Sequence, residues 1–224
     1  MTAFIVIAVL SLAGAVFFRS KQRFQASSPK FRAGAYLKWI GSRIKGFFSA
    51  SFFNRSVSLW DEWAKERYPG WLKWVFFAFA AAFLYLAASG LFYAVFIHRG
   101  MFGLPLLAHV MGGGVFALGL AFIMLFRARA YGFTAAETAP FEAFACPVFK
   151  NIPKALVVKT LFWTFAVLGF VQVVTALFSM LPVISFNTQA ALIMIHRYSA
   201  LGLVLTAIVF FDAAILGRPE PPRT

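Results

Sequence analysis

Long apolar runs, separated by polar and basic stretches, dominate the pattern of hydrophobic and polar positions along this chain. An α-helix needs about 20 consecutive apolar residues to cross a bilayer. Five runs approach or exceed that length: 3–18, 74–96, 104–126, 157–181 and 190–216. The alternative spanning structure, a closed β-barrel, is built from short segments of alternating hydrophobicity. The pattern therefore predicts an all-α integral membrane protein with five transmembrane helices.

Composition agrees with this class, and the distribution of charge predicts an orientation. Of the 224 residues, 62% are hydrophobic and 12% are charged, which excludes an ordinary soluble domain. Nineteen of the 21 lysines and arginines lie in 19–73, in 127–159 and in the tail. By the positive-inside rule these segments face the cytoplasm, so we expect a periplasmic N-terminus and a cytoplasmic C-terminus. The formal net charge of +14 then reflects topology and contact with anionic membrane lipid, and we expect no nucleic-acid partner.

The spans divide the chain into four predicted parts. Residues 1–18 are typical of an N-terminal transmembrane anchor, because their basic cluster follows the apolar core, whereas a secretory signal has the opposite order. Residues 19–72 form a basic cytoplasmic segment with an amphipathic helix, which either lies on the inner membrane surface or docks a cytoplasmic partner. Residues 73–217 form a four-helix bundle, and 218–224 form a proline-rich cytoplasmic tail.

All three histidines of the chain fall at the outer ends of predicted spans. His98 ends the second span, His109 opens the third and His196 opens the fifth. Ionisable side chains inside a membrane are costly and by default mark a function, and two neutral imidazoles from facing helices can ligate one haem iron within a bundle. We therefore predict one b-type haem with His109 and His196 as its iron ligands. His98 is a reserve ligand, a hydrogen-bond partner of a propionate or quinone, or an interfacial residue with no special role.

Residues near the two predicted ligands fit the same interpretation. Gly113, with a glycine on either side, removes side-chain bulk one turn after the first ligand, where a flat macrocycle needs space. Arg197, directly after the second ligand, and Arg99 can pair with the haem propionates at the outer rim. Gln172 and Thr175 are typical of polar residues that bridge membrane helices, and they carry no predicted role in the site.

Four loose motifs follow one another in the order of a known family. They are ERYPGWLKW followed by AASGL, then the set His109, Gly113, Phe116, Ala117 and Arg127, then KNIPKALVVKTLFWTFAVLGFVQVVTALFSMLP, and finally IHRYSAL. On these motifs, residues 66–216 resemble the four-helix b-type cytochrome membrane subunits of respiratory formate dehydrogenases and nickel–iron hydrogenases. The resemblance implies that the histidines of the second and fourth motifs are haem ligands.

The chain differs from the two-haem members of that family. Where they carry a second histidine pair, this sequence has the side chains of Trp71, Trp74 and Phe76 in the first core helix and of Phe210 or Phe211 in the last. None of these side chains ligates iron. The resemblance therefore implies a variant with a single haem.

The resemblance further implies the electron-transfer subunit of a respiratory complex in a bacterial inner membrane. Such a subunit passes electrons between the quinone pool and a periplasmic redox partner, a cytochrome c or an iron–sulfur protein, while other subunits perform the substrate chemistry. The sequence contains no cysteine cluster for an iron–sulfur centre and no phosphate-binding glycine loop. A haem-free anchor for redox partners is the alternative. A transporter is less consistent with the sequence, which shows no internal repeat and no broken helix.

Overall fold

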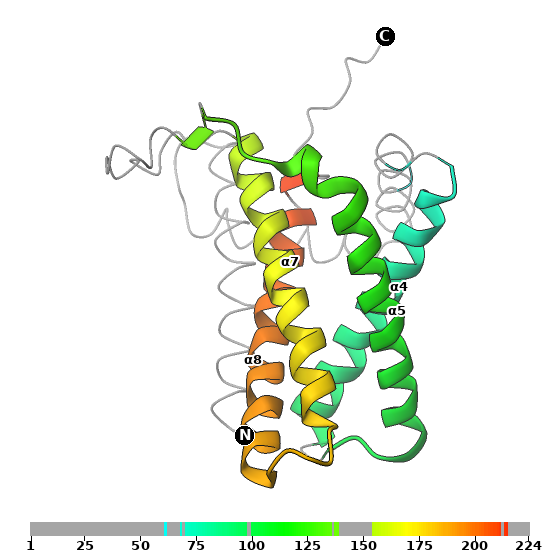
Figure 1. Ribbon diagram of the computed structural model, residues 1–224. Helices are drawn as coiled ribbons and strands as arrows, with labels where there is room; N and C mark the ends of the chain where they lie inside the picture. Colours follow the sequence, from blue (N-terminus) through cyan, green and yellow to red (C-terminus); the bar gives the residue numbers. More distant parts are fainter. Residues whose placement is uncertain are drawn as a thin grey trace, which may run out of the picture. The chain divides into compact units, whose positions relative to one another are not determined.

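The computed structural model describes residues 61, 68, 70–97, 100–135, 137–138, 154–211 and 213–214 (Figure 1). Its elements, in chain order, are α4 (Leu72–Phe92), the short π-helix η1 (Tyr93–Ile97), α5 (Gly103–Arg127), the 3-10 helix η2 (Ala128–Tyr131), α7 (Lys154–Ser179) and α8 (Phe186–Phe211). All regular structure among these residues is helical. The predicted all-α fold is therefore confirmed for this part of the chain.

Four helical segments are long and apolar enough to cross a membrane. They contain 25 to 29 residues each and comprise Leu72–Ile97, Gly103–Tyr131, Ala155–Ser179 and Phe186–Phe211. At 1.5 Å per residue, 25 residues extend about 38 Å, more than the roughly 30 Å of a bilayer's hydrocarbon core. Four of the five predicted spans are thus confirmed. The predicted span 3–18, the amphipathic helix within 19–72 and the tail lie outside the described residues.

The helix α8 begins four residues earlier than the apolar pattern predicts, because its polar first turn is capped. The Oγ of Ser185 accepts a hydrogen bond of 3.4 Å from the backbone N–H of Thr188, as an N-cap serine does. The segment 185–189, which precedes the predicted span 190–216, therefore supplies the cap and first turn of the helix. His196 lies about 15 Å along the axis from Phe186. The prediction that this histidine opens the helix is wrong.

The four long helices form two hairpins that pack against each other. The helix α4 packs along α5, α7 packs along α8, and α5 contacts α7 (Figure 1). A Cβ added to Gly119 of α5 would lie 2.7 Å from the Cβ of Phe79 on α4, and one added to Gly169 of α7 would lie 2.8 Å from Leu120 of α5. These glycines let neighbouring helices approach closely, as small residues do in membrane bundles.

An aromatic cluster joins the two hairpins. It consists of Phe79 and Phe83 from α4, Phe116 from α5 and Phe165 from α7. Phe79 and Phe116 stack with their ring centroids 5.1 Å apart, and Phe83 meets Phe165 edge to face at 5.5 Å. Such aromatic pairs contribute about 0.5–1.5 kcal/mol each beyond the area that they bury. The cluster therefore anchors the contact between the hairpins.

Buried side chains concentrate on one side of the aromatic cluster. Among the described residues, those after Ala82 on α4, before Phe116 on α5 and before Leu201 on α8 are half-buried or exposed. We call this half, which carries the turns of both hairpins (bottom of Figure 1), the hairpin end, and the other half the packed end. At the hairpin end, α7 alone carries buried side chains, those of Gln172 and Thr175.

Contacts between α7 and the residues that follow α5 hold the packed end together. The Nε1 of Trp163 donates a hydrogen bond of 2.9 Å to the carbonyl of Tyr131, and the Tyr131 ring stacks on Phe162 at 4.0 Å. Lys159 forms an ion pair with Glu137 at 2.7 Å. These contacts tie the first hairpin to the second at the end opposite the two turns.

Candidate functional site

His109 lies at the hairpin end, in the second turn of α5, with its ring against α4. The position that a Cβ on Gly90 would take is 3.6 Å from the Cε1 of His109, so the imidazole lies over a residue without a side chain. The Oγ of Ser89, the preceding residue on α4, is 2.9 Å from the Nδ1 of His109. The helix α4 therefore sets both the place and the orientation of this half-buried ring.

The hydroxyl of Ser89 links His109 to α4. Its Oγ lies 2.8 Å from the carbonyl of Tyr85 and 2.9 Å from the Nδ1 of His109. When the hydroxyl hydrogen goes to the carbonyl, the Nδ1–H of His109 donates to Oγ, and Nε2 keeps the lone pair with which histidine ligates a metal.

His196 of α8 is held in the same way by α7. Its Nδ1 lies 3.1 Å from the Oγ1 of Thr175, and this hydroxyl donates its own hydrogen to the carbonyl of Val171 at 2.7 Å. With that hydroxyl hydrogen on the carbonyl, the Nδ1–H of His196 donates to Oγ1 and Nε2 keeps its lone pair. Both histidines therefore have one ring nitrogen satisfied by a neighbouring helix and the other available.

Gln172 adds a second connection at His196. Its side-chain nitrogen donates to the carbonyl of His196 at 2.8 Å and to the Oγ of Ser199 at 2.6 Å. Gln172 and Thr175 are buried, with 8% and 4% of their surface exposed, so water does not compete for these bonds. The prediction that the two side chains bridge helices is confirmed, and both act directly on the histidine.

The two imidazoles are nitrogen donors on α5 and α8 at the hairpin end, and neither Nε2 has a hydrogen-bond partner among the described residues. No group of three or more histidine, cysteine or acidic side chains occurs within that part of the chain. A protein zinc site takes at least three protein ligands, whereas a haem iron takes four of its ligands from the porphyrin. By type and number, two imidazoles are thus compatible with a haem iron rather than with a protein zinc site.

The other predicted site residues are placed as follows. A Cβ on Gly113, one turn after His109, would meet nothing within 4 Å, whereas one on Gly112 would lie 3.1 Å from the Tyr85 ring. Arg197 is half-buried and directly follows His196 on α8. His98 and Arg99 lie outside the described residues.

Sequence reasoning missed three residues that orient the histidines, namely Ser89, Gln172 and Thr175. One signal for two of them is present in the sequence. A hydroxyl residue precedes each histidine by 20 residues in the first hairpin and by 21 in the second. Because a hairpin brings the end of one helix beside the start of the next, this repeated spacing places a hydroxyl near each imidazole.

Comparisons of this chain with protein-family models, with curated proteins and with solved structures found no match.

Proposed function

We propose that this protein is a membrane electron-transfer subunit of a respiratory complex that holds one b-type haem between His109 and His196. The observation that carries the proposal is the matched state of the two imidazoles. The Nδ1 of each lies within hydrogen-bond distance of a hydroxyl on the neighbouring helix, and neither Nε2 has a hydrogen-bond partner among the described residues. Metal-ligating histidines almost always have their other ring nitrogen held in this way.

The haem supplies one-electron chemistry when it is bound, and the protein's own residues provide binding and orientation. Ser89 and Thr175 fix the tautomer and the direction of the two ligands. Gly113 leaves space beside the first ligand. The charge of Arg197, next to the second ligand, is suited to pairing with a propionate. The aromatic cluster begins two turns along α5 from His109, toward the packed end, and fills the bundle there with apolar side chains.

The distribution of basic residues supports a position for this site near the outer face of a bacterial inner membrane. Arg127, Arg129 and Lys159 lie at the packed end, and Arg197 is the basic residue that the structure describes at the hairpin end. By the positive-inside rule the packed end faces the cytoplasm. Electrons then pass between membrane quinone and a periplasmic cytochrome c or iron–sulfur protein bound at the hairpin end.

A reduced-minus-oxidised absorption spectrum of the purified protein, with haem quantified per chain, tests the proposal. We expect one haem per chain in the wild type, and its loss in both His109→Ala and His196→Ala. His98→Ala is the matched control and should keep the haem. Size-exclusion chromatography of each variant checks that the bundle still assembles.

Three results would contradict this assignment. A wild-type protein that lacks haem when produced with ample haem supply favours the haem-free anchor. A well-assembled His109→Ala or His196→Ala protein with a full haem content shows that the ligands are elsewhere. Loss of haem in His98→Ala together with its retention in His109→Ala would assign the ligand role to His98.

A further inference from the structure

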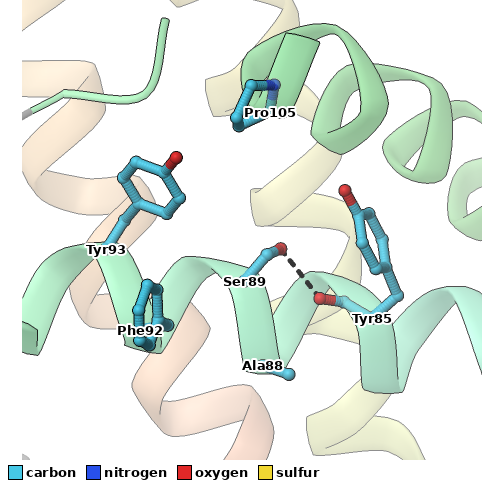
Figure 2. A pocket seen from close by; sticks show the side chains of 6 residues that line it. All are labelled: Tyr85, Ala88, Ser89, Phe92, Tyr93 and Pro105. Carbon is cyan, nitrogen blue, oxygen red and sulfur yellow. Dashed lines mark hydrogen bonds between the residues drawn. The ribbon is translucent and has the colours of Figure 1, made fainter.

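A hollow of about 500 Å³ lies at the hairpin end, and Ser89 is one of the residues that line it. It is formed by α4, η1 and the first turn of α5, and it lies within two of the membrane-spanning segments. Its lining consists of Tyr85, Ala88, Ser89, Phe92, Tyr93 and Pro105 (Figure 2). Small-molecule sites typically have volumes of roughly 300–1,000 Å³, so the hollow has the size of a ligand site.

Local sequence explains why the hollow forms at this point. The helix α5 begins at Gly103, whose φ of 62° is readily adopted by glycine. Pro105 follows in the first turn, where a missing backbone N–H breaks no helical hydrogen bond. Opposite it, α4 continues into the π-helical turn η1, which carries Tyr93. Ala88, with its small side chain, leaves the floor of the hollow open between these elements.

The hollow offers hydrogen-bond donors between apolar walls. Figure 2 shows the rings of Tyr85 and Tyr93 rising from the same side of the helix, on either side of Ser89 and toward Pro105. Neither phenol hydroxyl has a hydrogen-bond partner among the residues that the structure describes. A phenol hydroxyl that faces an apolar hollow gains by pairing with a hydrogen-bond acceptor. A ligand with two oxygen acceptors on an apolar ring would provide both.

The residues that line the hollow, and their exposure, indicate which class of ligand fits it. None of the six lining residues carries a charge, so nothing there favours the phosphate of a lipid headgroup over a neutral molecule. Phe92, with 50% of its surface exposed, and Tyr85, with 42%, open the hollow toward lipid. An acyl chain could fill it but would leave both hydroxyls unpaired. A flat lipid-soluble ring with carbonyl oxygens packs against the apolar walls and accepts hydrogen bonds from both hydroxyls.

We propose that this hollow binds the ring of a quinone or quinol, with the hydroxyls of Tyr85 and Tyr93 as hydrogen-bond donors to its oxygens. The functional meaning of the site rests on the proposed electron-transfer role, because Ser89 both lines the hollow and contacts His109 at 2.9 Å. A single hydroxyl then separates the quinone site from the imidazole of the proposed iron ligand.

Photolabelling of the full-length protein in lipid nanodiscs with an azido-ubiquinone, in competition with decylubiquinone, tests the inference. We expect the label on the peptides that contain residues 85–93 and 105, as mapped by mass spectrometry. Tyr85→Phe and Tyr93→Phe keep the rings and remove one donor each, and each should weaken decylubiquinone competition roughly fivefold. Labelling elsewhere, or unchanged affinity in both variants, would overturn the assignment.

Filling the hollow gives a second test. Ala88→Trp places an indole in the hollow and should reduce labelling by more than about tenfold. The matched control is Ala81→Trp, which introduces the same side chain two turns away at an exposed position on the same face of α4. Equal labelling in these two variants contradicts the proposal, whereas loss in Ala88→Trp alone supports it.

The two proposals can fail separately. Labelling at the hollow in a wild-type protein that holds no haem would preserve the quinone site and reject the haem. A bis-histidine haem spectrum with no labelling at the hollow would preserve the cytochrome and reject this quinone site. Haem content measured in Ala88→Trp must match the wild type for its labelling result to report on the hollow itself.

Discussion

The α4–α5 hairpin and the α7–α8 hairpin orient a histidine by the same means, but the second does so with one more hydrogen bond. In each, a hydroxyl on the first helix donates to a carbonyl one turn earlier and lies within hydrogen-bond distance of the Nδ1 of an imidazole on the second helix. In the second hairpin Gln172 also holds the backbone carbonyl of the histidine. In the first hairpin Ser89 is the described hydrogen-bond partner of the ring, and a hollow opens beside it.

This difference indicates that the two proposed ligands have different roles. His196 is held by the buried polar side chains of Gln172 and Thr175. His109 lies over a glycine and beside an open hollow, where a ligand can approach the hydroxyl that orients it. The two hairpins therefore hold their histidines in a similar way, and the hollow lies beside the first.

Among the predictions that compare the two hairpins, removal of the orienting hydroxyls is expected to have the largest effect. Loss of a group that orients a metal ligand typically costs about 10- to 100-fold in affinity. We expect Ser89→Ala to lie near the upper end of this range and Thr175→Val near the lower, because Gln172 still holds the carbonyl of His196. Both variants are compared with the wild type by two measurements, the rate of haem transfer to apomyoglobin and the haem midpoint potential.

Matched controls separate orientation from simple loss of a hydroxyl. Ser179 and Thr206 each donate to a carbonyl of their own helix and have no hydrogen bond to a histidine. Ser179→Ala and Thr206→Val should therefore leave both measurements near the wild-type values. If Thr175→Val weakens haem binding more than Ser89→Ala does, Gln172 does not have the holding role assigned to it.

Glycine substitutions compare the packing of the two hairpins. A Cβ on Gly119 would lie 2.7 Å from the Cβ of Phe79, whereas one on Gly202 would lie 3.4 Å from the flexible end of Leu168. Overpacking of this kind costs about 1–3 kcal/mol, so Gly119→Ala should lower the thermal unfolding temperature in detergent. Gly202→Ala should leave it unchanged or raise it, since alanine favours the helix by up to about 1 kcal/mol. Equal destabilisation by both would show that the second hairpin is as tightly packed as the first.

The smallest expected effect concerns the ion pair between Glu137 and Lys159, which ties the two hairpins together. A hydrogen bond from the Lys159 ammonium, aided by the Thr134 backbone N–H, lowers the pKa of Glu137 from 4.5 to about 2. A carboxyl whose pKa falls on folding stabilises the fold above its unfolded pKa and loses that contribution as pH drops through the folded value. The stability advantage of wild type over Glu137→Gln should therefore be full above pH 4.5 and shrink toward pH 2. Thermal melts of both proteins across this range measure it, and a constant difference would contradict it.

The sequence predicted the helical architecture well because the membrane leaves the backbone few choices. Four long apolar runs became four long helices, whose first residues lie one to four residues before the predicted starts. The largest of these shifts, at the start of α8, came from Ser185, which caps a polar turn that the apolar pattern cannot include. His196 consequently lies further from the first residue of its helix than predicted. Its Nδ1 is still close to Thr175 of the preceding helix, α7.

The sequence alone determined which segments can cross a membrane and which side chains can ligate iron, because both follow from residue type and run length. Only the tertiary structure decided that Ser89 meets His109 and that Thr175 meets His196. Those contacts depend on the register between two packed helices, which is set by where glycines such as Gly119 allow close approach. The register in turn places a hydroxyl beside the Nδ1 of each imidazole, and no pattern along a single helix contains that information.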